Sequence, residues 1–205
     1  TGIISTSSIV HATPAAFYTH TKNRSMYEDI ATQLVSSDID FFAGGGITYF
    51  NNRKDKINLI LELEKKGFSI NTESLPKNTK PVFNKKQGYL LASNGMPKML
   101  DGRGEFLTNA TKLAIESLSS NEEGFFLMIE GAQIDWGGHD NDAEYLISEL
   151  IDFDNTIGVA LDFAKLNGET LVIVTADHET GGFTLAQDNG DYNKIKPVFS
   201  TGGHS

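Results

Sequence analysis

The sequence predicts an α/β protein, a three-layer sandwich in which helices cover both faces of a mostly parallel central sheet. Short apolar runs typical of buried strands alternate with longer segments that repeat apolar residues at helical spacing. Segments rich in Gly, Asp and His directly follow several of these runs, as expected where ligands gather at the carboxyl ends of parallel strands. With 205 residues and 39% hydrophobic content, the chain has the size and composition of a single domain over residues 1–205.

The first part of the chain is expected to supply the first strand and helix units. Residues 3–10 are β-branched and serine-rich, which is typical of a strand that delivers His11 and Thr13 at its carboxyl end. Pro14 suits the first turn of a helix. The elements expected next are helices over residues 15–21 and 27–35, a strand over 39–43 that three glycines close, a helix over 55–66 that stops at Gly67, and a strand over 68–71.

Residues 72–104 predict an irregular excursion with brief strands, because most of the prolines and several lysines fall there between short apolar runs. We expect no catalysis in this excursion. From residue 105 onward the periodicity is clear again. The expected elements are a helix over 105–118, a strand over 125–129, a long helix over 143–166 and a strand over 170–175.

Composition excludes several classes of protein. A net charge of −10 argues against a nucleic-acid partner, which clustered Lys and Arg normally bind. No apolar run approaches the roughly 18 residues of a membrane-spanning helix, so we expect no membrane partner. The chain has no cysteine, so a metal site would use His, Asp, Glu and hydroxyl ligands. An acidic protein that handles phosphate needs local positive charge, which bound metal ions can provide.

The segment after the strand at 125–129 contains the first candidate ligands. Asp135 and His139 are four residues apart, so one helical turn would place both on the same face, although the two glycines between them make a loop equally possible. A carboxylate with an imidazole suits Zn²⁺. Glu130, at the end of the strand, is a hard oxygen ligand better suited to Mg²⁺.

The other histidines show a common pattern. Asp177 and His178 follow an apolar run and precede two glycines, an arrangement that can put two ligands into one site. His204 lies among glycines that would let the backbone approach a metal. Of the five histidines, His20 is the exception, since we expect it inside a helix as an ordinary core or surface residue. In the segment of His11, a threonine hydroxyl could ligate a metal, and the guanidinium of Arg24 could bind phosphate through two hydrogen bonds.

Four of these segments, taken in order, resemble the active-site motifs of the alkaline phosphatases. They read HATPAAFYTHTKNR, FFLMIEGAQIDWGGH, TADHETGG and STGGH, and they spread over the whole chain. The resemblance implies the three-layer α/β sandwich of that family, here incomplete at both ends. It also implies a phosphate monoesterase that works through two zinc ions, one magnesium ion and a phosphoserine intermediate.

The resemblance assigns a role to each candidate residue. The implied ligands are Asp135, His139 and His204 for the first zinc, Asp177 and His178 for the second zinc, and Thr13 and Glu130 for the magnesium. Arg24 would bind the substrate phosphate. His11 stands where some members carry Asp, and we expect it to act on the metal through water, with direct ligation left open. Trp136 stands where some members carry Lys, so both positions are expected to tune the site.

The family's serine nucleophile and a metal-bridging Asp are expected to precede residue 1. Ser5, Ser7 and Ser8 are interpreted as ordinary strand residues and not as a replacement for the nucleophile. The isolated polypeptide is therefore expected to be inactive and to bind at most one zinc ion well. Because a parallel sheet without one of its strands exposes edges and apolar faces, we also expect self-association into a homo-oligomer.

Two alternatives remain open. The same metal core could serve a phosphodiesterase, phosphomutase or sulfatase of the wider superfamily, or the chain could be a metal-binding module without chemistry. The HATPAAFYTH and IDWGGH segments favour the phosphatase. Small phosphate monoesters are the substrates that the resemblance implies, and a periplasmic or secreted location is expected from it alone.

Overall fold

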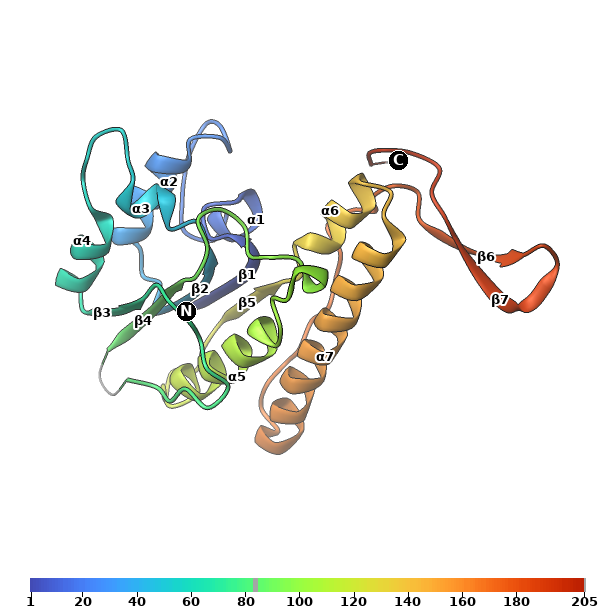
Figure 1. Cartoon of the computed structure of the whole chain (residues 1–205). Helices are drawn as coiled ribbons and strands as arrows, with labels where there is room; N and C mark the ends of the chain where they lie inside the picture. The colour runs from blue at the N-terminus through green and yellow to red at the C-terminus, as the bar shows by residue number, and fades with distance from the viewer. Residues whose placement is uncertain (83–84, 205) are drawn as a thin grey trace.

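The computed structural model describes residues 1–82 and 85–204, and its centre is a five-stranded sheet (Figure 1). The strand order is β3-β4-β2-β1-β5, and each neighbouring pair is parallel. The strands are β1 (Gly2–Ser8), β2 (Phe41–Gly45), β3 (Phe68–Asn71), β4 (Lys86–Leu90) and β5 (Leu127–Glu130). The predicted α/β class with a mostly parallel sheet is confirmed.

Helices cover both faces of this sheet, which gives the three predicted layers (Figure 1). They are α1 (Ala12–Ala15), α2 (Tyr27–Val35), α3 (Thr48–Asn51), α4 (Leu59–Lys65), α5 (Phe106–Leu118), α6 (Gln133–His139) and α7 (Ala143–Asn167), with a 3-10 turn at Met99–Asp101. Helices α2 and α4 pack on one face, and α5 packs on the other.

The two cores are set by the alternation of side chains along the strands. Phe42 and Ile3 pack with α2 and α4, while Phe41 and Ile4 pack with α5. All four side chains are fully buried. Because successive residues of a strand point to opposite faces, β1 and β2 each supply one residue to each core.

The chain departs from the prediction in its first 104 residues. The helix expected over 15–21 is wrong: α1 ends at Ala15, and the chain turns so that the Tyr18 hydroxyl donates to the Ile9 carbonyl at 2.8 Å. His20 consequently lies exposed outside any helix. The excursion over 72–104, of which residues 83–84 lie outside the described part, contributes β4 between β2 and β3. The prediction thus missed that one of its brief strands lies inside the sheet, paired on both edges.

The strand predicted over 170–175 is wrong. Its residues are not part of any sheet in the described chain, and Leu171 and Ile173 are 81% and 76% exposed. The segment returns from the far end of α7 to α6, where Thr180 contacts Gly138 (Figure 1). An apolar extended run forms a strand only where its backbone pairs with a strand edge, and among the described residues this run pairs with none.

A hairpin that the sequence analysis did not predict projects from the body beyond α6 and α7 (Figure 1). It pairs β6 (Thr184–Asp188) with β7 (Asp191–Val198) in antiparallel fashion. The turn residues Asn189 and Gly190 have φ of 49° and 82°. An Asn-Gly pair with both φ values positive is the preferred two-residue hairpin turn, so this signal was present in the sequence.

Candidate metal centre

The ends of β1 and β5 bring two of the predicted motifs together. These strands are neighbours in register, with Ser5 opposite Glu130. The chain then leaves β1 through His11 into α1, and it leaves β5 through a short turn into α6. The Thr13 hydroxyl lies close enough to the Glu130 carboxyl to lower its pKa, so residues far apart in sequence meet at one edge of the sheet.

Helix α6 resolves the choice between helix and loop for the segment of Asp135. One helical turn places His139 on the same face, with its Nε2 atom 3.5 Å from Asp135 Oδ1. The intervening glycines allow close packing. A Cβ atom on Gly137 would lie 2.7 Å from the backbone of Leu146, and one on Gly138 would lie 2.9 Å from Thr180.

The imidazoles of three segments converge beside Asp135. The ring of His204 lies 3.8 Å from that of His178 and 5.1 Å from that of His139, measured between centroids. One ligand atom from each of Asp135, His178 and His204 lies within 4.8 Å of the other two. Asp135 and His204 are predicted ligands of the first zinc, and His178 is a predicted ligand of the second. The two predicted groups of zinc ligands therefore lie directly beside each other.

Hydrogen bonds between loops bring these histidines to α6. The Gly181 N–H donates to the Gly203 carbonyl at 2.8 Å, which ties the TADHETGG and STGGH segments together. The Thr180 hydroxyl donates to Asp135 Oδ1 at 2.5 Å. His139 Nδ1 lies 3.2 Å from the Gly202 carbonyl, so this loop also orients a predicted ligand.

Glu130 sits in a cluster of oxygen atoms next to this imidazole group. The Ser5 hydroxyl donates to its Oε2 atom at 2.5 Å. Burial raises the pKa of the Glu130 carboxyl above its ordinary value, the charge of Asp177 raises it further, and hydrogen bonds from the hydroxyls of Ser5, Thr13 and Ser7 oppose the shift. A carboxylate that is costly to ionise, with a second carboxylate nearby, is an environment that a bound cation would stabilise.

Arg24 and His11 form a further group of the site, near Asp135 and Trp136. The Nη2 atom of Arg24 lies 3.4 Å from His11 Nε2, and the imidazole meets the Trp136 ring edge-on at 5.9 Å. Burial lowers the pKa of His11, the positive charge of Arg24 lowers it further, and Asp135 opposes this. The lowered pKa favours the neutral form of the His11 ring near pH 7, and the Arg24 side chain is exposed.

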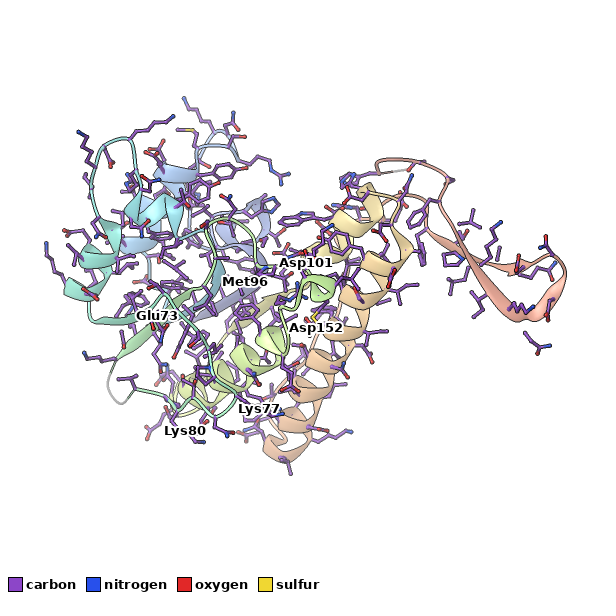
Figure 2. All side chains as sticks on the ribbon, viewed as in Figure 1. Glu73, Lys77, Lys80, Met96, Asp101 and Asp152 are labelled. Carbon is purple, nitrogen blue, oxygen red and sulfur yellow. The ribbon has the colours of Figure 1, made fainter. Side chains whose placement is uncertain are left out.

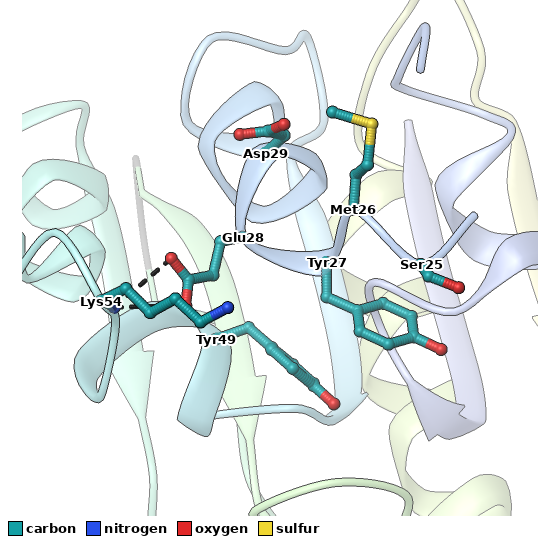
Figure 3. A pocket seen from close by; sticks show the side chains of 7 residues that line it. All are labelled: Ser25, Met26, Tyr27, Glu28, Asp29, Tyr49 and Lys54. Carbon is teal, nitrogen blue, oxygen red and sulfur yellow. Dashed lines mark hydrogen bonds between the residues drawn. The ribbon is translucent and has the colours of Figure 1, made fainter. Parts of the chain in front are cut away.

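A separate shallow hollow of about 300 Å³ is lined by residues that begin with Ser25, the residue after Arg24 (Figure 3). The rings of Tyr27 and Tyr49 lie 5.0 Å apart in it, and the Glu28 carboxylate accepts from the Lys54 backbone N–H at 3.2 Å. The lining residues are Ser25, Met26, Tyr27, Glu28, Asp29, Tyr49 and Lys54. None of the predicted ligands belongs to this hollow.

Sequence reasoning missed Ser5, Ser7 and Thr180, which hydrogen-bond or orient the predicted ligands. Ser5 and Ser7 are fully buried on β1, where the prediction treated them as ordinary strand residues. Their signal was the spacing of two, which points both hydroxyls to the face of the strand that meets Glu130.

The fold and this cluster together define a class: an α/β protein with Asp, Glu and His side chains gathered at the carboxyl ends of parallel strands, suited to metal ions. Within that class, the family model for alkaline phosphatases matches residues 1–200. The chain belongs to the alkaline phosphatase family.

Individual relatives agree with this assignment. Alkaline phosphatase 4 of Bacillus subtilis (strain 168) is 41% identical over 98% of this chain and 44% of its own length, and alkaline phosphatase 3 of the same strain is 41% identical over 94% and 42%. The structure of alkaline phosphatase from the Antarctic bacterium TAB5 matches with a TM-score of 0.95 and 56% identity, over 100% of this chain and 62% of that one. The chain therefore spans less than half the length of these curated relatives.

Two further structures concern magnesium. They are variants of the TAB5 enzyme, with a histidine replaced by Glu or by Asp, and both hold Mg in a site called M3. Each matches this chain with a TM-score of 0.94 and 55% identity.

Proposed function

We propose that the protein containing this chain is a metal-dependent phosphate monoester hydrolase. The observation that supports this most strongly is the convergence of ligand atoms from Asp135, His178 and His204 within 4.8 Å. The Arg24 guanidinium, able to bind phosphate, lies against His11, whose pKa is affected by the charge of Asp135. The curated relatives are named alkaline phosphatases, which supports the same reaction.

The donor set fits two kinds of metal ion. Imidazoles with a carboxylate are the ligands zinc prefers, whereas carboxylate and hydroxyl oxygens suit magnesium. We propose that two zinc ions share the imidazole cluster and one magnesium ion binds the oxygen cluster. The proposed ligands are Asp135, His139 and His204 for the first zinc, Asp177 and His178 for the second, and Glu130 and Thr13 for magnesium.

Residues of this chain would bind and orient the phosphate group of the substrate. The Arg24 guanidinium would bind two phosphate oxygens, and the neutral His11 ring would support its orientation without adding repulsion. When bound, the metal ions would stabilise negative charge on the attacking and leaving oxygens and lower the pKa of a water molecule. We propose that a serine nucleophile lies in the part of the full-length protein that corresponds to the region of the relatives outside this chain.

Substrate comparison tests this proposal. The full-length protein, supplied with zinc and magnesium, is expected to hydrolyse a chromogenic phosphate monoester in clear preference to the matching diester or sulfate ester. Arg24→Ala should lower kcat/KM by about 100-fold or more, because it removes a charge-assisted bidentate contact to the phosphate. Lys22→Ala, which removes another exposed cation two residues away, should have little effect.

Two outcomes would contradict the assignment. Preference for the diester or the sulfate ester would favour another reaction of the superfamily. Metal binding without hydrolysis of any of these esters would favour a non-catalytic metal module.

The proposed location and partners rest on the family resemblance alone. We propose a periplasmic or secreted enzyme that acts on small phosphate monoesters. None of the helices in the described part of the chain is long and apolar enough to cross a membrane.

A further inference from the structure

Ser5 and Ser7 are two buried hydroxyl groups on β1 to which the proposed function assigns no role. Both residues have no solvent-exposed surface. Their spacing of two places them on one face of the strand, and that face meets β5 at Glu130. The hydroxyl of Ser8, on the same strand, instead accepts from the Val10 backbone N–H at 3.3 Å.

The Ser5 hydroxyl connects Ser7 to Glu130. The Ser5 hydroxyl donates to Glu130 Oε2 at 2.5 Å and accepts from the Ser7 backbone N–H at 3.0 Å. Its oxygen also lies 2.7 Å from the Ser7 hydroxyl oxygen. The Ser7 hydroxyl has one proton, which it can donate to Ser5 Oγ or to the Ser8 carbonyl 3.1 Å away. With either partner, the Ser5 hydroxyl keeps its own donation to the Glu130 carboxylate.

We propose that Ser5, supported by Ser7, is a positioning residue that fixes the Glu130 carboxylate in the orientation required for the divalent cation of the oxygen cluster. This inference rests on the proposed function, because Glu130 is a proposed magnesium ligand there. The register of β1 against β5 sets the position of the hydroxyl, and burial of both serines excludes competition from water. Hydrogen-bond partners that orient a metal ligand commonly change metal affinity by 10- to 100-fold.

A purely structural role would give a different result. If Ser5 only satisfied buried polar groups, its removal would lower the stability of the fold and weaken every metal site to a similar extent. A positioning role instead predicts a selective effect on the oxygen cluster. Glu130 belongs to that cluster, whereas the imidazole cluster is ordered by Thr180 and the Gly181 loop.

Calorimetric titration of the metal-free, full-length protein with Mg²⁺ and separately with Zn²⁺ tests this proposal. Ser5→Ala is expected to weaken Mg²⁺ binding by about 10- to 100-fold. It should leave Zn²⁺ binding unchanged to within about threefold. Ser7→Ala should weaken Mg²⁺ binding less than Ser5→Ala does.

Two control variants accompany this test. Ser5→Thr keeps the hydroxyl, so it should retain most of the Mg²⁺ affinity and guards against misfolding of the alanine variant. Ser8→Ala is the matched control and should bind both ions as the wild type does.

Three results would overturn the proposal. Unchanged Mg²⁺ affinity in Ser5→Ala, with normal binding by the wild type, would remove the positioning role alone. Equal losses of Mg²⁺ and Zn²⁺ affinity would assign Ser5 a structural role. Absence of Mg²⁺ binding by the wild type would overturn the proposed magnesium site, and the positioning role with it.

Discussion

Arg103 is the buried cation that joins the long helix α7 to the end of the irregular excursion. Its guanidinium lies 2.5 Å from Glu149 and 2.9 Å from Asp152, and its side chain and that of Glu149 have almost no exposed surface. Figure 2 labels Asp152 where α7 packs beside the 3-10 turn that contains Asp101. The Met99 N–H also donates to Glu149 at 2.8 Å. Sequence periodicity could not reveal this cluster, because the partners lie 46 to 49 residues apart.

Removal of this cation should destabilise the protein strongly. Arg103→Met would leave two buried carboxylates without their cation, which commonly costs about 3–5 kcal/mol. Denaturant unfolding of the metal-free protein should show the loss as a lower midpoint. Lys77→Met, which breaks an exposed ion pair with Glu105, serves as control and should change the midpoint little. Equal midpoints for the two variants would contradict the stabilising role of the cluster.

Single residues also mark the limit of what the sequence revealed about the site. The motifs of Asp135, His178 and His204 were identified as metal-binding candidates, because Asp and His beside glycines at strand ends form a recognisable pattern. Ser5 was not identified, since its partner lies 125 residues away and nothing in the local sequence reports burial. The resemblance assigned His178 and His204 to different zinc ions, so it did not predict that their two rings would lie against each other.

At the scale of elements, long periodic segments were predictable and short or unpaired ones were not. Helices α2, α5 and α7 lie within a residue or two of their predicted bounds, because apolar spacing and end signals agree. Asp142, for example, accepts from the Tyr145 N–H at the start of α7, and Gly168 ends it with φ of 75°. Apolar content alone also predicted the strand at 170–175, but a strand requires a partner.

Helix α6 should tolerate no side chain at its second glycine. Gly138→Ala would drive a Cβ atom against Thr180, the residue whose hydroxyl holds Asp135. We expect a loss of about 1–3 kcal/mol in stability from this overpacking. Zinc affinity should fall as well, since the loop that orders the imidazoles is displaced.

The matched control is Gly158→Ala in α7, where a new Cβ atom meets nothing within 4 Å. A helix-interior change from glycine to alanine should stabilise the protein by about 0.5–1 kcal/mol. Thermal unfolding and zinc titration of both variants measure the contrast. Wild-type zinc affinity in Gly138→Ala would show that α6 does not depend on this contact.

At the scale of the whole molecule, the described chain leaves apolar surface uncovered. Leu166, Leu171 and Ile173 are 91%, 81% and 76% exposed, and Phe126, next to β5, is 51% exposed. Strand β5 pairs only with β1 among the described strands, so its other edge is open to a further strand. Exposed apolar side chains together with an open strand edge favour coverage by another polypeptide.

The 205-residue polypeptide alone should therefore self-associate. Light scattering at micromolar concentration is expected to show a dimer or larger assembly. Leu171→Lys combined with Ile173→Lys should shift it toward monomer, because two charges would enter the apolar surface. Lys substitutions at the exposed Leu61, which lies on α4 on the opposite side of the sheet, provide the control. A monomeric wild-type polypeptide would contradict this prediction.

The central claim is that the converging histidines and carboxylates hold catalytic metal ions, and the metal content of the full-length protein tests it most directly. Elemental mass spectrometry after dialysis should find two zinc ions and one magnesium ion per chain. His204→Ala should lose about one zinc ion, whereas the exposed His20→Ala, outside the site, should lose none. A wild-type protein that retains no zinc, or a His204→Ala variant that retains all of it, would contradict the account.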